Sequence, residues 1–212
     1  MRNLTERQLR RRERILSAAR ELIARQGYDG VKMRDLAKAA DVAPKTLYHQ
    51  FENKENLLRT AVEERYRRTY RAIDDTDIDR GIDRLFFIVD TVATTTRKNL
   101  AYARALAPML RSSTSFAEIR LRSYRKAIDQ IEAEGEFLDW VDVGLLTAII
   151  YRQVNPLYLT WFFSKEAQPH LASVARLDMS LILRSVSTGY THERVTETIL
   201  EMQEKLQGTR FG

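Results

Sequence analysis

The spacing of apolar residues constrains this chain more than any other feature of its sequence. Nearly every long segment carries apolar residues at intervals of three and four, which is the period of an α-helix. No segment shows the sustained period-two alternation with β-branched residues that is typical of a strand. We therefore predict an all-α protein.

The same spacing predicts where the helices lie. The first runs from about Thr5 to Gln26, and Gly27 follows where a left-handed C-cap belongs. A second helix begins near Met33, and a third opens at Pro44, because proline suits the first helical position. Asn53 fits the N-cap of a fourth helix that extends toward residue 70. Further helices are expected near residues 82–97, 100–111, 115–134, 139–163, 171–189 and 192–207.

Composition separates the chain into a basic and a weakly acidic part. Residues 1–71 hold 18 Lys or Arg and 10 Asp or Glu, whereas the remaining residues hold 17 and 19, so the overall charge of +6 divides into +8 and −2. A localised basic excess suits a polyanion such as DNA, because neutralised phosphates release counterions. Charge alone does not distinguish DNA binding from an ordinary solvated helix face. With 212 residues the chain is expected to form one small and one larger domain.

Several other classes of protein are excluded or disfavoured. The chain has no cysteine, which excludes a disulfide framework and thiolate chemistry, and its charged N-terminus lacks a signal sequence, so we expect a cytoplasmic protein. Asp75, Asp77 and Asp79 have the spacing of a calcium loop, but the glycine and glutamate that this loop needs are absent. Residues 143–163 are apolar, yet Arg152 at their centre makes a buried helix the better interpretation than a membrane span. The scattered histidines predict no metal site, and no cofactor is expected.

Two short helices joined by a tight turn, preceded by a packing helix and set in basic charge, are typical of a helix-turn-helix. The residues concerned are Arg14-Ile15-Leu16-x-Ala18-Ala19, Gly27-Tyr28, Leu36-Ala37-x-x-Ala40, Val42 and Thr46-Leu47-Tyr48-x-x-Phe51-x-x-Lys54-x-x-Leu57. This pattern resembles the TetR family of transcriptional repressors over about the first 60 residues. The resemblance implies an N-terminal three-helix DNA-binding domain, residues 1–58, and a larger helical ligand-binding and dimerisation domain, residues 59–212.

Three residues depart from the family pattern. Asp41 stands at the turn position usually held by glycine, and aspartate tolerates the left-handed conformation that this turn requires better than most residues do. Ala43 replaces a serine that would cap the third helix, and Lys32 replaces a threonine or serine near the start of the second. These departures affect local stability and operator contacts more than the DNA-binding function itself.

The third helix is expected to carry most of the DNA contacts. If Leu47 and Phe51 face the core, the neighbouring polar side chains project away from it. Lysine and threonine suit base edges or phosphates, and tyrosine commonly hydrogen-bonds the backbone. The alternative for Tyr48 is a structural role, in which its half-buried ring braces the short helix instead of contacting DNA. The candidate DNA-binding residues are Lys32, Arg34, Lys45, Thr46, Tyr48, His49 and Lys54. Arg10, Arg11, Arg12 and Arg14 form either a basic arm or an ordinary solvated helix start.

The rest of the chain carries no motif that identifies a ligand. Large or polar residues on apolar helices are the candidates for a pocket lining, although each is also explained as plain core. They are Phe86, Asp90, Tyr102, Met109, Tyr124, Arg152, Gln153, Tyr158 and Trp161. Residues 139–163 and 171–189 are the most apolar long segments, and the resemblance places a four-helix dimer interface there, with Leu177 and Leu181 as candidate contacts.

These observations favour a sequence-specific regulator, most simply a repressor that a small-molecule ligand releases from a palindromic operator. The homodimer is expected because one short recognition helix contacts too few base pairs for specificity. An architectural protein that binds DNA without sequence preference is the second hypothesis. An enzyme on a helical scaffold is the third, and it is disfavoured because the sequence shows no nucleophile with its base and no phosphate-binding loop.

Overall fold

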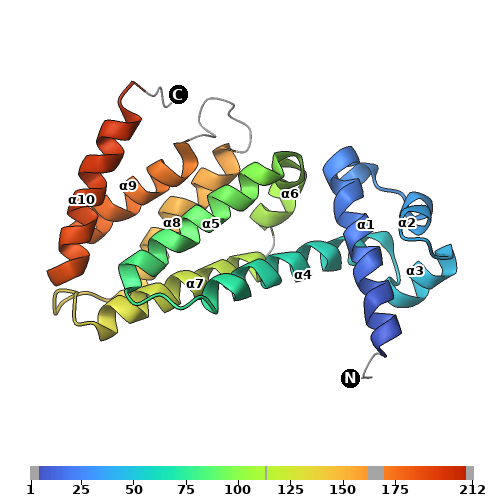
Figure 1. The fold of residues 1–212 in the computed structure, drawn as a ribbon, viewed down its shortest axis with the longest axis horizontal. Helices are drawn as coiled ribbons and strands as arrows, with labels where there is room; N and C mark the ends of the chain where they lie inside the picture. The colour runs from blue at the N-terminus through green and yellow to red at the C-terminus, as the bar shows by residue number, and fades with distance from the viewer. Residues whose placement is uncertain (1–4, 113, 162–169, 209–212) are drawn as a thin grey trace. The chain divides into compact units, whose positions relative to one another are not determined.

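A computed structural model describes residues 5–112, 114–161 and 170–208, and the regular structure of this part of the chain is helical (Figure 1). The elements are α1 (Glu6–Gly30), α2 (Met33–Ala39), α3 (Pro44–Phe51), α4 (Lys54–Asp74), α5 (Gly81–Lys98), α6 (Leu100–Ser112), α7 (Thr114–Ala133), α8 (Val143–Trp161), α9 (Leu171–Arg184) and α10 (Gly189–Leu206). Among the described residues, the strand-like pairing consists of an isolated bridge between Phe137 and Ser187. The predicted all-α class is confirmed.

Several predicted helices have different ends from those expected. α1 is assigned to Gly30 instead of Gln26, although Gly27 breaks the helix with the positive φ, 75°, of the predicted left-handed cap. α4 ends at Asp74 instead of near residue 70, and α10 begins at Gly189 instead of 192.

α8 begins at Val143 instead of 139, because the carboxylate of Asp142 accepts a hydrogen bond from the N–H of Leu145 at 2.9 Å and so caps the helix there. α9 ends at Arg184 instead of 189, because the chain then leaves the helix to form the bridge at Ser187. None of the helices in the described ranges has the length and apolar character that a membrane crossing requires.

Contacts between Cα atoms divide the chain into two compact units. The first unit comprises residues 1–69 and 99–110, and the second comprises residues 70–98 and 111–212. α6 therefore belongs mostly to the first unit although it follows α5 in sequence. In the first unit, apolar residues of α1, α2, α3 and α4 share one core. Its buried members include Ile15, Leu16, Leu22, Ile23, Leu36, Leu47, Phe51, Leu57 and Leu58.

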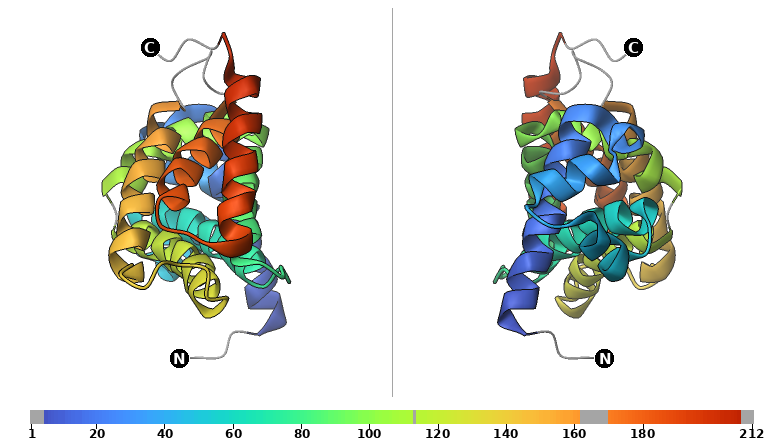
Figure 2. Two further views of the ribbon diagram at one scale, coloured as in Figure 1. Left: turned by 90° about the vertical axis from the view of Figure 1, so that its left-hand side faces the viewer. Right: turned by 90° about the vertical axis from the view of Figure 1, so that its right-hand side faces the viewer.

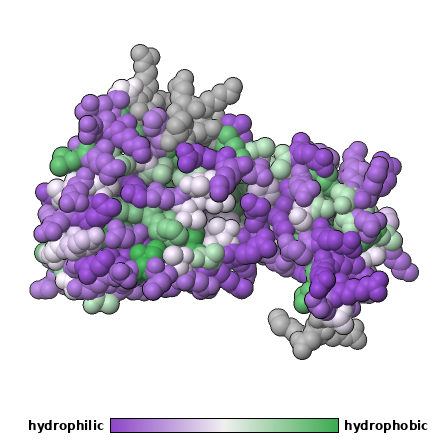
Figure 3. Space-filling model, in the orientation of Figure 1, coloured by the Kyte–Doolittle hydropathy of each residue, from purple (hydrophilic) through white to green (hydrophobic). Residues whose placement is uncertain are grey.

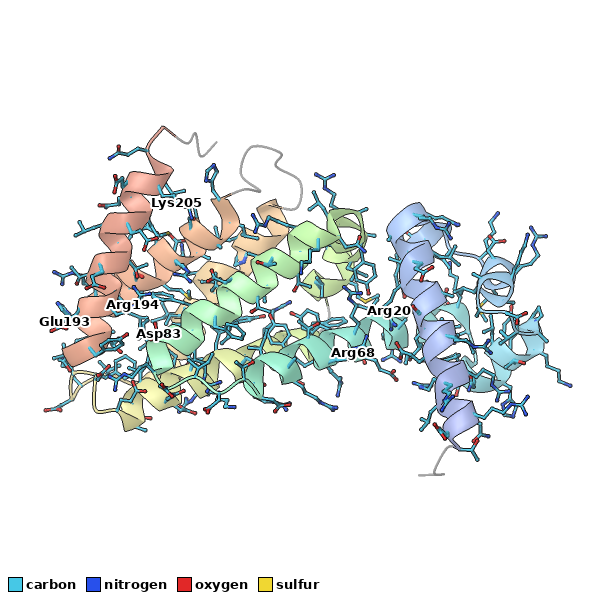
Figure 4. All side chains as sticks on the ribbon, viewed as in Figure 1. Arg20, Arg68, Asp83, Glu193, Arg194 and Lys205 are labelled. Carbon is cyan, nitrogen blue, oxygen red and sulfur yellow. The ribbon has the colours of Figure 1, made fainter. Side chains whose placement is uncertain are left out.

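In the second unit, the helices α5, α7, α8, α9 and α10 pack against one another, and α9 and α10 lie side by side (Figures 1 and 2). α5 approaches α7 closely at Gly81, where an added Cβ would lie 2.5 Å from the Cγ1 atom of Ile131. Only glycine fits at that approach. Arg194 of α10 and Asp83 of α5 face one another, with 3.3 Å between the Nε and Oδ1 atoms (Figure 4).

Buried polar residues hold the connections of the second unit in place. Arg84 donates to the carbonyls of Thr76 and Ile78 at 3.2 and 3.3 Å, so the acidic segment after α4 is bound by protein groups. Glu136 accepts hydrogen bonds from the N–H and hydroxyl of Thr191 at 2.9 and 2.6 Å and pairs with Arg80. Burial alone would raise the pKa of Glu136, but the Thr191 hydrogen bonds and the charge of Arg80 hold the pKa below its usual value.

Candidate nucleic-acid interface

The turn between α2 and α3 is closed by a Schellman motif. The N–H of Val42 donates to the carbonyl of Ala37 at 3.0 Å, and the N–H of Asp41 donates to the carbonyl of Lys38 at 3.3 Å. This motif requires a left-handed residue, and Asp41 has a φ of 51°. The prediction that aspartate occupies the left-handed position usually held by glycine is confirmed.

α3 is oriented by its two large apolar residues. Leu47 is fully buried and Phe51 is 2% exposed, and because these residues are one helical turn apart, their burial fixes the rotation of α3. Lys45 and His49 are exposed on the opposite side. Tyr48 is 52% exposed, so its ring is available at the surface. Thr46 is half-buried and lies beside the turn.

The start of α4 is fixed by its cap. The side-chain oxygen of Asn53 accepts a hydrogen bond from the N–H of Asn56 at 2.8 Å, so Asn53 is the N-cap, as predicted. Lys54 follows it, half-buried, with its ammonium 3.4 Å from the carbonyl of Asp29. No pattern in the sequence predicts the conformation of Glu52, which has a φ of 66° and lets the N–H of Asn53 reach the carbonyl of Phe51 at 2.7 Å. This is a γ-turn, a strained and short connection, so that α4 begins at Lys54, three residues after α3 ends.

The remaining DNA-contact candidates lie at the start of α2. Lys32 is at the N-cap position and Arg34 lies in the first turn, and both are exposed. Neither Lys32 nor Ala43 makes a side-chain cap hydrogen bond. The first unit therefore holds all seven candidates on three consecutive helix starts and on the outer face of α3. Such an arrangement can meet phosphates and base edges together.

Three of the pocket candidates contact side chains of neighbouring helices in the second unit. Phe86 is buried, with the guanidinium carbons of Arg176 and Arg194 at 4.8 and 5.7 Å from its ring centre. Asp90 accepts a hydrogen bond from Arg176 Nε at 3.0 Å, a partner that the sequence did not indicate. Tyr124 is buried, with its ring centre 6.4 Å from that of Tyr151.

The other pocket candidates are placed differently. Tyr102 and Met109 belong to α6 and group with the first unit. The hydroxyl of Tyr102 is buried without a hydrogen-bond partner among the described residues, and burial raises the pKa of this tyrosine to about 12. Arg152 and Gln153 lie on the exposed side of α8, where Gln153 donates to Asp178 at 3.3 Å. The side chains of Tyr158 and Trp161 lie outside the described residues.

Comparison with known proteins connects the first unit to a family of regulators. Residues 15–61 match the model described as "Bacterial regulatory proteins, tetR family". The chain is 34% identical over 104 residues to the HTH-type transcriptional repressor KstR of Mycolicibacterium smegmatis. That alignment covers 48% of this chain and 51% of KstR, so the chain spans about half the length of this relative.

Two solved structures share the fold over most of the chain. The fatty acid degradation regulator FadR from Bacillus halodurans superposes with a TM-score of 0.67 at 21% identity, covering 86% of this chain and 97% of FadR. FadR from Bacillus subtilis in complex with stearoyl-CoA gives a TM-score of 0.63 at 23% identity, covering 80% and 96%. These likenesses confirm the fold, an N-terminal helix-turn-helix followed by a helical domain.

The left-handed turn at Asp41 leads to a prediction about stability. Asp41→Gly removes the steric cost of a Cβ at positive φ, which stabilises the folded state by about 1–2 kcal/mol. Glycine also increases the conformational entropy of the unfolded chain, which opposes this gain by about 0.4–1 kcal/mol. We expect the free energy of unfolding to stay unchanged or to rise by up to about 1.5 kcal/mol, measured by urea denaturation. Asp41→Ala is the matched control, because it removes the same carboxylate but keeps the Cβ, and it should be less stable than the glycine variant. A glycine variant less stable than the alanine variant would contradict this account of the turn.

Proposed function

The chain belongs to the TetR family through the helix-turn-helix of residues 15–61, and from this premise we propose that it is a sequence-specific transcriptional regulator, a repressor that a small molecule releases from its operator. The observation that carries the proposal is the orientation of α3. Leu47 and Phe51 are buried while Lys45, Tyr48 and His49 are exposed, which is the arrangement that a recognition helix needs to enter a major groove.

The candidate DNA contacts have separate roles in this proposal. Lys45, Thr46 and His49 lie on α3 and meet base edges or nearby phosphates. Tyr48 fixes the register of α3 through its hydroxyl on the DNA backbone. Lys54 lies in the first turn of α4, where its charge and the positive end of the helix dipole together favour a phosphate. Two further cations at the start of α2, Lys32 and Arg34, are placed for backbone contacts.

The effector is proposed to bind the helical domain that follows. We assign residues 1–58 to DNA binding and residues 59–212 to ligand binding and dimerisation, with α4 running across this boundary as one helix. The complex of Bacillus subtilis FadR with stearoyl-CoA makes acyl-CoA thioesters the first class of effector to test. A ligand releases the operator to the extent that it binds the released conformation more tightly than the DNA-bound one.

A homodimer is proposed to form through α8 and α9. Both helices expose large apolar side chains, with Leu145 65%, Ile149 42% and Leu181 51% exposed. The two helices pack against each other, and Gln153 of α8 bonds Asp178 of α9. Two such pairs from two copies would bury these side chains in a four-helix arrangement. The second copy of this chain is therefore the occupant that we propose for this surface.

The first test of the function separates base contacts from phosphate contacts. Duplexes are selected from a random pool by the wild-type protein, and affinities for the selected and for random DNA are compared. Lys45→Ala or Thr46→Ala should reduce that preference by the equivalent of about 1–3 kcal/mol. Lys54→Ala should weaken binding to both duplexes equally and lower the slope of log K against log salt by about one.

The control for these variants is Lys205→Ala on α10, which removes one exposed lysine far from α3 in sequence (Figure 4). It should leave preference and salt slope unchanged. Equal losses on both duplexes for Lys45→Ala and Thr46→Ala would reassign these residues to phosphates. A wild-type protein that enriches no sequence at all would contradict the regulator and support the architectural DNA-binding protein.

The dimer surface makes a separate prediction. Leu181→Glu places a charge on the exposed part of α9 and should shift the protein from dimer to monomer in sedimentation experiments, with loss of tight operator binding and retention of weak, salt-sensitive binding. Adding Leu177→Glu should complete the shift. Leu200→Glu is the matched control, because Leu200 is 65% exposed on α10, outside this surface. A wild-type monomer at micromolar concentration that binds a palindrome tightly would overturn the dimer.

A further inference from the structure

The arginines at the start of α1 divide between two faces of the helix. One face is directed at α4: Arg12 pairs with Glu64, and its guanidinium carbon lies 5.1 Å from the ring centre of Phe51. On the same side, Glu13 pairs with Arg20 at 2.6 Å and with Arg68 at 3.6 Å (Figure 4). These contacts stabilise the packing of α1 within the first unit, so Arg12 and Arg20 are structural.

A second face of α1 carries four arginines that follow the helical spacing i, i+3, i+4 and i+7. They are Arg7, Arg10, Arg11 and Arg14. Together with Glu6, these arginines line one side of a surface groove of about 740 Å³. Its other side is formed by Asp41, Val42 and Thr46, the turn and the recognition helix of the helix-turn-helix. We call this feature the α1 groove.

The charge of the α1 groove favours an anion. Four arginines face two acids, Glu6 and Asp41, which leaves a net charge of +2. Arg10 pairs with Glu6, but both side chains are 77% exposed. Such an exposed pair contributes little to stability, so a phosphate can replace Glu6 as the partner of Arg10. Arg7 and Arg14 are exposed and make no ion pair with another described residue. The Nε atom of Arg11 is buried and has no hydrogen-bond partner within the described part of the chain. Figure 3 shows hydrophilic residues along the visible face of this part of α1.

The helical state of α1 decides which part of DNA these arginines meet. Thr5 and Gln8 form a reciprocal capping box, so the helix begins at Glu6, and the arginines are not an extended arm. A helix with its side chains is about 10–12 Å across, whereas the minor groove of B-DNA is about 6 Å wide. The helix therefore cannot enter the minor groove as an extended arm does. Arginines on its surface are placed for backbone phosphates.

We propose that the α1 groove binds backbone phosphates of the DNA duplex that α3 contacts. This inference rests on the proposed function, because Thr46 contributes both to the recognition helix and to the wall of the groove. A duplex in contact with Thr46 passes beside Arg14 and Arg7 and presents phosphates to their guanidinium groups, which match phosphate oxygens in pairs. The groove extends the DNA-binding surface from the helix-turn-helix onto the first three turns of α1.

The test is the salt dependence of DNA binding by the full chain. A fluorescently labelled random duplex is titrated with wild-type protein and with Arg7→Ala/Arg14→Ala at several salt concentrations. The slope of log K against log salt should fall by about two in the double variant, because each lost phosphate contact removes about 0.9 from the slope. The preference for a selected duplex over random DNA should stay unchanged, because phosphates carry no sequence information.

Two controls separate this effect from loss of charge or of structure. Arg25→Ala removes an exposed arginine from the far end of the same helix and should leave the slope unchanged. Arg7→Lys/Arg14→Lys keeps the charges and should keep most of the slope. Circular dichroism reports whether α1 remains folded in each variant.

The outcomes distinguish this inference from the proposed function. An unchanged slope in Arg7→Ala/Arg14→Ala, with Lys54→Ala lowering the slope as expected, overturns the α1 groove and leaves the regulator intact. A changed sequence preference in the double variant overturns the phosphate assignment, because the arginines then contact bases. A wild-type protein that binds no duplex overturns the proposed function and the groove with it.

Discussion

The burial of Leu47 and Phe51 is the constraint on which the rest of the DNA-binding surface depends. α3 has eight residues, too few to be stable alone, and these two side chains attach it to the core of the first unit. Because they lie one turn apart, they also set which residues face outward. The Schellman turn at Asp41 then determines where α3 begins relative to α2. Apolar packing and one left-handed residue together determine the position of Lys45, although Lys45 takes part neither in the packing nor in the turn.

Positive charge in the first unit serves two purposes that composition cannot separate. The run Arg10-Arg11-Arg12-Glu13-Arg14 is almost uniformly basic, yet helical geometry turns Arg12 toward Glu64, whereas Arg10, Arg11 and Arg14 line the groove beside the turn of the helix-turn-helix. An ion pair within the fold stabilises the position of α1, whereas Arg7 and Arg14, which make no ion pair among the described residues, are accessible to a ligand. The excess of basic residues in the N-terminal third is thus partly structural, and we propose that the rest binds DNA.

Local patterns in the sequence predicted local structure well. Helical spacing predicted every helix in the described ranges, and the chemistry of single residues predicted the left-handed turn at Asp41 and the cap at Asn53. Contacts distant in sequence were not predictable. Asp90 pairs with Arg176, which lies 86 residues later in the chain, and the grouping of Tyr102 with the first unit depends on how α6 packs. The γ-turn at Glu52 has no compositional signal, because glutamate is not a turn-forming residue.

In the proposed dimer, two copies of α3 contact two half-sites on the same face of DNA. Affinity for a selected duplex with two inverted half-sites tests it directly when the spacing between them is changed. Inserting about five base pairs turns one half-site to the opposite face, and inserting about ten turns it back. The five-base-pair insertion should reduce affinity to that for random DNA, and the ten-base-pair insertion should be less damaging. Equal affinity for all three spacings would contradict it.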